Sequence, residues 1–169
     1  MRLSELGVDP VQREQRNRAK RVFFKGPRRS IMIGIVIVTH SQLGDALIEA
    51  AEFILGDRPD TMVSVSINLK EDVDKLRQKI SEGIKKVDNH KGVLILTDMF
   101  GGTPSNLSYS FLEEGKVEVI SGVNLPILIK AVDFQKKEVD LCDLAEQLEA
   151  FGKKSISLAS GILKGNKRK

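Results

Sequence analysis

The chain has 169 residues, of which 41% are hydrophobic and 30% charged, a composition typical of one globular domain with an ordinary hydrophobic core. Its formal net charge of +4 is unevenly distributed, because residues 1–31 hold nine Lys/Arg against three Asp/Glu and residues 32–169 hold 18 against 20. The slightly acidic body and the aromatic content of 5% argue against nucleic acid as a partner, and no segment is long enough to span a membrane.

The basic residues are concentrated in an N-terminal leader. Residues 1–31 have few apolar side chains and no sustained period, which predicts a disordered segment or a short helix. Met32 opens the first strand pattern, so we expect the natural start at Met32, with a species-specific arm as the alternative. Arg28-Arg29 resembles an export signal only faintly, because the apolar run after it is short. The basic residues 164–169 are expected to form a solvated tail.

The first half of the body alternates strand and helix patterns. Residues 32–38 form a continuous β-branched run, typical of a strand buried on both faces. Residues 45–55 carry a helical apolar stripe that Gly56 is placed to end. Residues 62–67 alternate with period two and predict a strand near the edge of a sheet. Residues 70–87 predict an amphipathic helix with acids leading and bases trailing.

The second half repeats this alternation. A short buried strand begins at Gly92 and ends at Thr97-Asp98. The elements expected after it are a helix over 105–115 that ends at Gly115, a strand over 117–120, a helix over 126–134, and a long final helix over 138–163 with a potential break at Gly152. The single cysteine, Cys142, excludes an intrachain disulfide framework, fits a reducing cytoplasm and is predicted to be a small core residue of the final helix.

The order of these elements predicts an α/β fold. Strands that alternate with helices pair in parallel through right-handed crossovers, so we expect an open, mostly parallel sheet of about four strands with helices on both faces. No internal repeat or linker divides the body, and we therefore expect one domain over residues 32–163. The exposed edges of such a small sheet favour oligomerisation.

Two strand exits carry reactive side chains. In open α/β sheets, ligands bind beyond the carboxyl ends of the strands. The first strand pattern leads into Thr39-His40-Ser41 and the third into Thr97-Asp98, so His40 and Asp98 meet if these strands are neighbours. An aspartate bound to one imidazole nitrogen leaves the other free as a nucleophile or base. The alternative is that Asp98 caps the following turn and His40 is a surface histidine.

A glycine-rich turn follows the third strand. The sequence FGGTP, residues 100–104, supplies two glycines whose backbone can approach a ligand closely, and then opens a helix. A glycine-rich turn that leads into a helix N-terminus favours an anion, and the segment after His40 opens a second helix nearby. On chemistry alone, this combination predicts a phosphorylated His40. The residues expected to hold its phosphoryl oxygens are Ser41, Gly101, Gly102 and Thr103.

Three segments of the chain resemble one known family. VIVTHSQLGDAL, LTDMFGGTPSN and VISGVNLPIL, in this order, are similar to the enzyme IIA domain of the mannose-type sugar phosphotransferase system, over about residues 32–160. The resemblance implies that His40 takes a phosphoryl group from the phosphocarrier protein HPr and passes it to a IIB component. It also implies that Asp98 orients the imidazole and that the glycines and Thr103 of the FGGTP turn line the phosphate position.

The same resemblance implies a fold and a set of partners. Members of the family are parallel α/β proteins, commonly homodimers that exchange a further edge strand, possible here as an antiparallel strand, for which residues 153–157 are the candidate. The chain stops near the end of the IIA domain, so we expect a separate IIB protein as acceptor, a cytoplasmic location, and contact with the membrane only through sugar permease components. No cofactor is expected. We also expect no metal, because His40 and His90 are far apart and there is one cysteine.

Two other functions remain open. A regulatory phosphoprotein would use the same phosphohistidine without sugar transport. The phosphotransfer subunit of dihydroxyacetone kinases also has a histidine at a strand end, but it lacks a GGTP-type turn. A response-regulator receiver needs paired acids after the first strand, where this chain has Thr39-His40, and a Rossmann domain needs G-x-G-x-x-G there. The sugar is not determined by this sequence.

Overall fold

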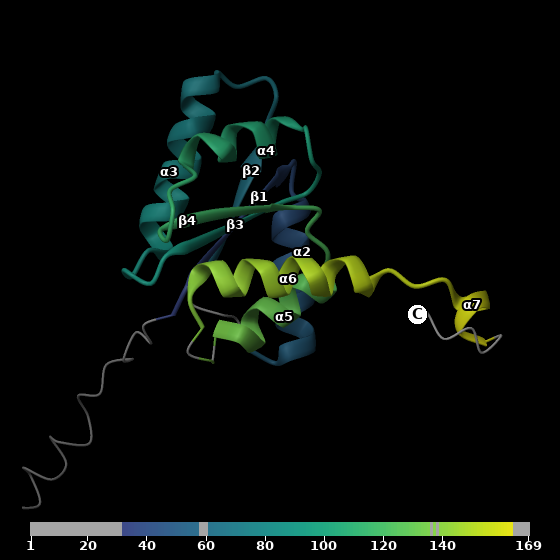
Figure 1. Ribbon diagram of the computed structural model, residues 1–169. Helices are drawn as coiled ribbons and strands as arrows, with labels where there is room; N and C mark the ends of the chain where they lie inside the picture. The colour runs from purple at the N-terminus through teal and green to yellow at the C-terminus, as the bar shows by residue number, and fades with distance from the viewer. Residues whose placement is uncertain (1–31, 58–60, 136, 138, 164–169) are drawn as a thin grey trace, which may run out of the picture. The chain divides into compact units, whose positions relative to one another are not determined.

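The computed structural model shows strands and helices that alternate along the chain from β1 (Gly34–His40) to α6 (Leu141–Ser155) (Figure 1). The described residues are 32–57, 61–135, 137 and 139–163. The predictions for the leader, residues 1–31, and for the tail, residues 164–169, lie outside this part of the chain. Among the residues that the structure describes, no helix is both long enough and apolar enough to cross a membrane.

The centre of the fold is a four-stranded parallel sheet, as predicted (Figure 1). Its strands are β1 (Gly34–His40), β2 (Met62–Ile67), β3 (Val93–Thr97) and β4 (Val117–Ser121). They lie in the order β2-β1-β3-β4, so β2 is an edge strand, as its alternating pattern predicted. From β1 the chain adds β2 next to one edge of β1, and then adds β3 next to the opposite edge of β1. The strand order therefore reverses between β1 and β3, which is where ligands bind in such sheets.

Helices cover both faces of the sheet, which confirms the predicted fold class (Figure 1). One face carries α2 (Leu43–Leu55), α5 (Leu125–Gln135) and α6 (Leu141–Ser155). The other carries α3 (Val73–Val87), α4 (Thr103–Ser108) and the 3-10 turn η1 (Tyr109–Phe111). Along β1, Ile35 and Ile37 pack in the core on the α5 and α6 side, whereas Val36 packs in the core on the α3 side. Because both faces are covered, β1 is apolar without interruption.

Local signals mark the end of α2, as predicted, and the start of α3, three residues later than predicted. Gly56 follows α2 in the left-handed conformation, with φ 77°, and its N–H donates to the carbonyl of Glu52. α3 begins after Asp72, whose carboxylate accepts a hydrogen bond from the N–H of Asp74. Val73, the first residue of α3, is exposed.

The helix expected over residues 105–115 is shorter than predicted. Regular α-helix stops at the end of α4 and tightens into η1. The Ser108 hydroxyl donates to the carbonyl of Pro104 at 2.7 Å, a side-chain hydrogen bond of the kind that disturbs regular helix. Gly115, with φ 70°, lies in the turn before β4 and does not end the helix.

The final helix is divided, but not at Gly152. α6 continues through Gly152 to Ser155, residues 156–158 are extended, and α7 (Ala159–Leu163) follows. Gly152 is buried, and a Cβ at this position would overlap the side chain of Ile127 on α5. The glycine therefore lets two helices pack closely and does not break either of them.

The prediction that Cys142 fills the core is wrong, because Cys142 is exposed. The buried stripe of α6 instead contains Leu141, Leu144, Ala145 and Leu148. Successive helical residues are rotated by about 100°, so the residue after Leu141 faces solvent. The negative charge of Glu146, together with slight burial and other nearby acids, raises the pKa of the Cys142 thiol.

The structure describes no exchanged strand. Within its described residues the sheet has four strands, and β4 forms one edge. Of the candidate residues 153–157, the first three belong to the end of α6, and Ile156 begins the extended segment. An exchanged edge strand therefore stays a prediction.

Candidate functional site

His40 and Asp98 lie together at the ends of two neighbouring strands. β1 runs two residues further than predicted, so His40 is its last residue, and Asp98 directly follows β3. The two strands pair with Val38 opposite Thr97. Asp98 Oδ2 accepts a hydrogen bond from the backbone N–H of His40 at 2.8 Å and lies 2.8 Å from Nδ1 of the imidazole. The strand order thus meets the condition under which these two residues were expected to touch.

The Asp98 carboxylate is held in its ionised form. Burial alone would raise its pKa, but the backbone N–H and ring of His40 and the N–H of Met99 together hold the pKa below its ordinary value of 3.8. The Met99 N–H donates to Oδ1 at 2.9 Å, so Asp98 also caps the turn after β3. The Asp98 side chain is 11% exposed and the His40 side chain 35% exposed. The carboxylate is therefore shielded, while the imidazole can be reached from solvent.

The ionised carboxylate decides the tautomer of His40. A carboxylate only accepts hydrogen bonds, so Nδ1 must carry the proton in its contact with Asp98. In the neutral ring, Nε2 then holds a lone pair. Chemically, this arrangement is an oriented nucleophile or base.

The FGGTP turn lies against the imidazole. Gly101 has φ 76°, a left-handed conformation that favours glycine, and its carbonyl accepts a hydrogen bond from the Asn106 side chain at 3.2 Å. Gly102 caps α4, and a Cβ built there would lie 3.0 Å from Cε1 of His40. Thr103 follows as the first residue of α4. Two glycines are therefore needed at this turn for different reasons, one for its conformation and one for its close approach to the ring.

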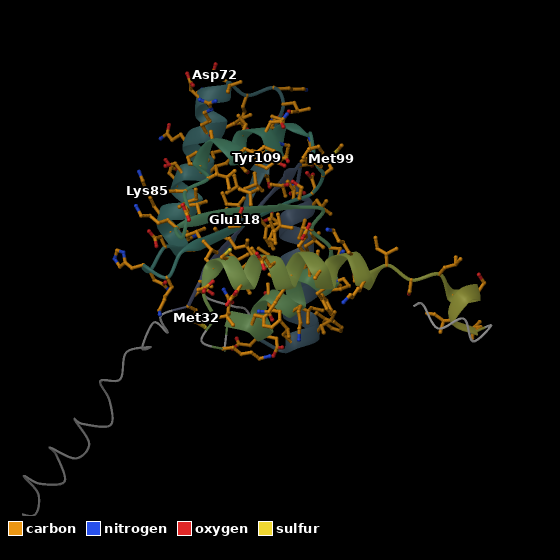
Figure 2. The ribbon with its side chains drawn as sticks, in the orientation of Figure 1. Met32, Asp72, Lys85, Met99, Tyr109 and Glu118 are labelled. Carbon is orange, nitrogen blue, oxygen red and sulfur yellow. The ribbon has the colours of Figure 1, made fainter. Side chains whose placement is uncertain are left out.

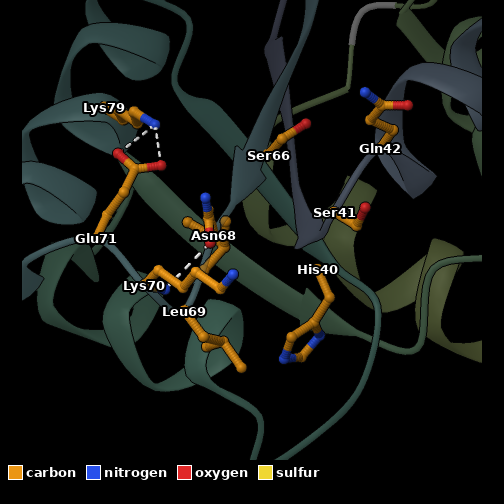
Figure 3. A pocket seen from close by; sticks show the side chains of 10 residues that line it. His40, Ser41, Gln42, Ser66, Asn68, Leu69, Lys70, Glu71 and Lys79 are labelled. Atoms are coloured by element: carbon orange, nitrogen blue, oxygen red, sulfur yellow. Dashed lines mark hydrogen bonds and ion pairs between the residues drawn. The ribbon is translucent and has the colours of Figure 1, made fainter.

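Ser41 is the predicted site residue whose side chain lies apart from the imidazole. It has φ 51°, a conformation that non-glycine residues rarely adopt, and its N–H donates to the carbonyl of Ile67 at 3.1 Å. In Figure 3 its hydroxyl points away from the ring of His40. The structure thus brings Gly102 to His40 with Gly101 and Thr103 beside it in the chain, and leaves the Ser41 hydroxyl turned elsewhere.

A groove of about 640 Å³ opens beside His40 (Figure 3). One wall is the exit of β1, and the other contains residues 66–71 at the exit of β2 together with Lys79 of α3. Lys79 is paired with Glu71 at 2.6 Å. Reactive side chains at the exits of the first and third strands were predicted, but residues at the exit of the second strand were not. These residues could have been predicted, because the carboxyl ends of all strands in a parallel sheet lie on the same side of the domain.

Apolar side chains project from the turn next to the site. Phe100 is 80% exposed. Met99 is also exposed (Figure 2). The Phe100 ring centroid lies 6.5 Å from that of Tyr109. Phe100 therefore does not pack in the core of the described residues, and its exposed ring is available to a docking partner.

The remaining titratable residues form no second centre in the part of the chain that is described. No group of three or more His, Cys, Asp or Glu side chains there is arranged to hold a metal ion. His90 is exposed, with φ 71°, in the turn that precedes β3. It therefore lies at the end of β3 opposite to Asp98.

The fold and the site define a class of protein: a parallel α/β domain that presents an aspartate-oriented histidine where its strand order reverses. Comparisons with known proteins make the class specific. Residues 34–149 match the family described as "PTS system fructose IIA component". The chain is 32% identical over 130 residues to the "PTS system fructose-specific EIIA component" of Bacillus subtilis (strain 168), which covers 76% of this chain and 88% of that protein.

Two further comparisons also match components of the phosphotransferase system. The chain is 35% identical over 101 residues to the "PTS system mannose-specific EIIAB component" of Escherichia coli (strain K12), which covers 59% of this chain and 31% of that longer protein. The crystal structure of phosphotransferase system component EIIA from Streptococcus agalactiae has a TM-score of 0.68 and 28% identity, and covers 76% of this chain and 98% of its own. This chain belongs to the PTS EIIA family and is a component of its mannose class. The match favours this family over the dihydroxyacetone kinase subunit.

Proposed function

We propose that this chain is a phosphocarrier of the phosphoenolpyruvate-dependent sugar phosphotransferase system. It accepts a phosphoryl group from HPr on His40 and passes it to a separate IIB protein. The observation that carries the proposal is the 2.8 Å contact between His40 Nδ1 and the ionised Asp98, because this contact leaves Nε2 as a nucleophile. The likeness to EIIA and EIIAB components supports HPr as donor and IIB as acceptor.

The proposed reaction proceeds through a phosphohistidine. The lone pair of His40 Nε2 attacks the phosphorus atom of the phosphorylated donor. A new N–P bond forms while the bond between phosphorus and the donor atom breaks, and its electron pair returns to the donor. The proton on Nδ1 stays in place, and the ionised Asp98 stabilises the positive charge that develops on the ring. The second transfer is the same exchange, with an acceptor side chain of IIB as the nucleophile.

The phosphoryl oxygens are expected to lie over the FGGTP turn. The close approach of Gly102 to the imidazole supports contacts from its backbone and from Gly101 and Thr103. Ser41 can join these contacts only after its side chain turns towards the ring. Dispersed hydrogen-bond donors of this kind stabilise the charge on phosphoryl oxygens without forming covalent bonds.

The proposed setting is the cytoplasm, with a homodimer as the working unit and the membrane reached only through permease components. The β4 edge and the exposed apolar side chains of Ile156 and Leu158 in the extended segment support self-association. The names of the similar proteins mention fructose, mannose and sorbose, so no single sugar is proposed.

The proposal is tested by transferring phosphate to the full chain. The protein is mixed with phosphoenolpyruvate, enzyme I and HPr, and its intact mass is measured. One acid-labile, alkali-stable phosphoryl group should be gained by the wild type and by the His90→Ala control, and lost in His40→Ala. Labelling that survives in His40→Ala would refute the assignment, as would a wild type that gains no phosphate.

A second measurement separates transport from regulation. Phosphorylated protein is mixed with a IIB protein, and the mass of each partner is followed. Rapid movement of phosphate to IIB supports the carrier function. Phosphate that stays on His40 in the presence of IIB contradicts it and indicates a regulatory phosphoprotein.

A further inference from the structure

Four hydroxyl side chains form a connected group between α4, η1 and the ends of β3 and β4. Ser105 of α4 donates to the Tyr109 hydroxyl of η1 at 3.0 Å. Ser121, the last residue of β4, lies 2.9 Å from the Ser105 hydroxyl and 3.2 Å from that of Tyr109. Thr97, the last residue of β3, donates to Ser121 at 2.9 Å. Figure 2 shows Tyr109 in this region, between α4 and the sheet.

The number of available protons fixes which hydroxyl donates and which accepts in each contact of the group. Each hydroxyl has one proton to donate. Since Ser105 donates to Tyr109 and Thr97 donates to Ser121, the remaining contacts require Tyr109 to donate to Ser121 and Ser121 to donate to Ser105. Three hydroxyls therefore form a closed ring with Thr97 attached to it. Thr97 and Ser105 are fully buried, and a buried polar network with every proton used holds its elements at defined distances.

We call the closed ring of the Ser105, Tyr109 and Ser121 hydroxyls the hydroxyl ring. With Thr97 attached, it joins the end of β3, which leads into Asp98, to the start of α4, which packs against the imidazole. Thr97 precedes Asp98, which binds Nδ1 of His40. Ser105 lies in the first turn of α4, three residues after Gly102, which packs against Cε1. A shift of α4 relative to β3 would push Gly102 against the His40 imidazole and change the direction in which Nε2 points.

We propose that Ser105, Tyr109 and Ser121 are positioning residues for phosphoryl transfer. Their hydroxyl ring sets the distance between Asp98 and the start of α4, and so holds the His40 imidazole in the orientation that transfer requires. Apolar side chains would fill the same space, but they would not fix that distance, because packing is not directional. The inference rests on the proposed phosphocarrier function.

The test measures transfer from HPr to full-length variants that each lack one hydroxyl. Ser105→Ala and Ser121→Ala should each lower kcat about tenfold, with KM for HPr changed less than about twofold, because misplacing a nucleophile affects the reaction step more than partner binding. The imidazole ¹⁵N chemical shifts of His40 should change in the same variants. Ser121→Thr, which keeps a hydroxyl, should restore both kcat and the shifts.

Ser108→Ala is the matched control. Ser108 is also buried in α4, but its hydroxyl donates to the carbonyl of Pro104 and lies outside the ring. This variant should keep kcat and the ¹⁵N shifts of the wild type, even where its melting temperature falls as far as that of Ser105→Ala. Tyr109→Phe offers a milder change that removes one hydroxyl and keeps the aromatic ring.

Two outcomes would overturn the inference. The first is that Ser105→Ala and Ser121→Ala keep the kcat of the wild type. The second is that Ser108→Ala loses kcat to the same extent as these two variants. Failure of the proposed function is separately visible, since the wild type would then gain no phosphate. In that event the ¹⁵N shifts of unphosphorylated protein still decide whether the hydroxyl ring orients His40, and unchanged shifts would reject it.

Discussion

The reactivity of His40 depends on which ring nitrogen carries its proton. Asp98 determines this through one oxygen, Oδ2, which is 2.8 Å from both the backbone nitrogen and Nδ1 of His40. The backbone contact places the carboxylate, and the ring contact selects the tautomer. A strand-end histidine without such a partner would present either nitrogen, so the pair is the smallest unit with a defined chemistry.

Asp98→Asn should slow phosphorylation of His40 by about 10²–10⁴-fold, because an amide can donate to Nδ1 and so favours the wrong tautomer. Initial rates with phosphorylated HPr measure the effect. Asp45→Asn is a suitable control, since Asp45 accepts hydrogen bonds from Ser64 and Ser66 and does not touch the ring. Equal loss of rate in both variants would contradict the role of Asp98.

Asp98 should also make the stability of the fold depend on pH. Its folded-state pKa lies below 3.8, so its ionised form stabilises the fold above the unfolded pKa, and this contribution is lost as the pH falls through the folded pKa. The difference in free energy of unfolding between wild type and Asp98→Asn should therefore shrink as the pH is lowered from about 5 to about 2. Denaturant unfolding at several pH values measures it. A difference that stays constant would contradict the expected shift.

Among the helices and turns, glycines serve two structural functions, a left-handed backbone conformation and close packing between helices. Gly56 and Gly101 have positive φ and serve as turn residues. Gly152 serves the packing of α6 on α5, because its missing Cβ leaves room for Ile127. A glycine within a helical pattern therefore does not by itself indicate a break.

Gly152→Ala should destabilise the fold by about 1–3 kcal/mol, because the added methyl group overlaps Ile127. Gly161→Ala is the control, since a Cβ there meets no atom within 4 Å, and its effect should stay within about 0.5 kcal/mol. Urea unfolding compares the two variants. Similar losses in both would show that overlap at Ile127 is not the cause.

At the scale of the whole molecule, the sheet has an open edge at β4, and the segment after α6 carries exposed apolar residues. Neither feature is explained by the packing of the described residues alone. Both are explained if two copies associate through these regions, which is the homodimer proposed above.

Light scattering at increasing concentration should therefore report a dimer for the wild type. Ile156→Asp and Leu158→Asp should shift the equilibrium towards monomer, because a charge in an apolar interface is costly to bury. Phe53→Asp is the control, since Phe53 is also exposed, on α2, but lies outside the proposed contact. A wild type that stays monomeric at all concentrations would contradict the homodimer.

Most of the element order could be predicted because it is encoded locally. Apolar runs and a period-two pattern located the strands, and helical patterns located α2, α3 and α5 to within a few residues. The errors at Cys142 and Gly152 fell where packing between distant segments decides the outcome. Cys142 lies one position away from the buried stripe of α6, and its exposure depends on how that helix packs on the sheet.

By itself, the sequence determined the alternation of strands and helices, the polar exits that carry His40 and Asp98, and the glycine-rich turn between strand and helix. These are properties of neighbouring residues. The adjacency of β1 and β3, the approach of Gly102 to the imidazole, and the meeting of four hydroxyls between α4, η1 and the ends of β3 and β4 follow from the tertiary structure alone. The physical reason is that hydrogen bonds and close contacts between residues far apart in the chain depend on the spatial order of the strands, which no local pattern specifies.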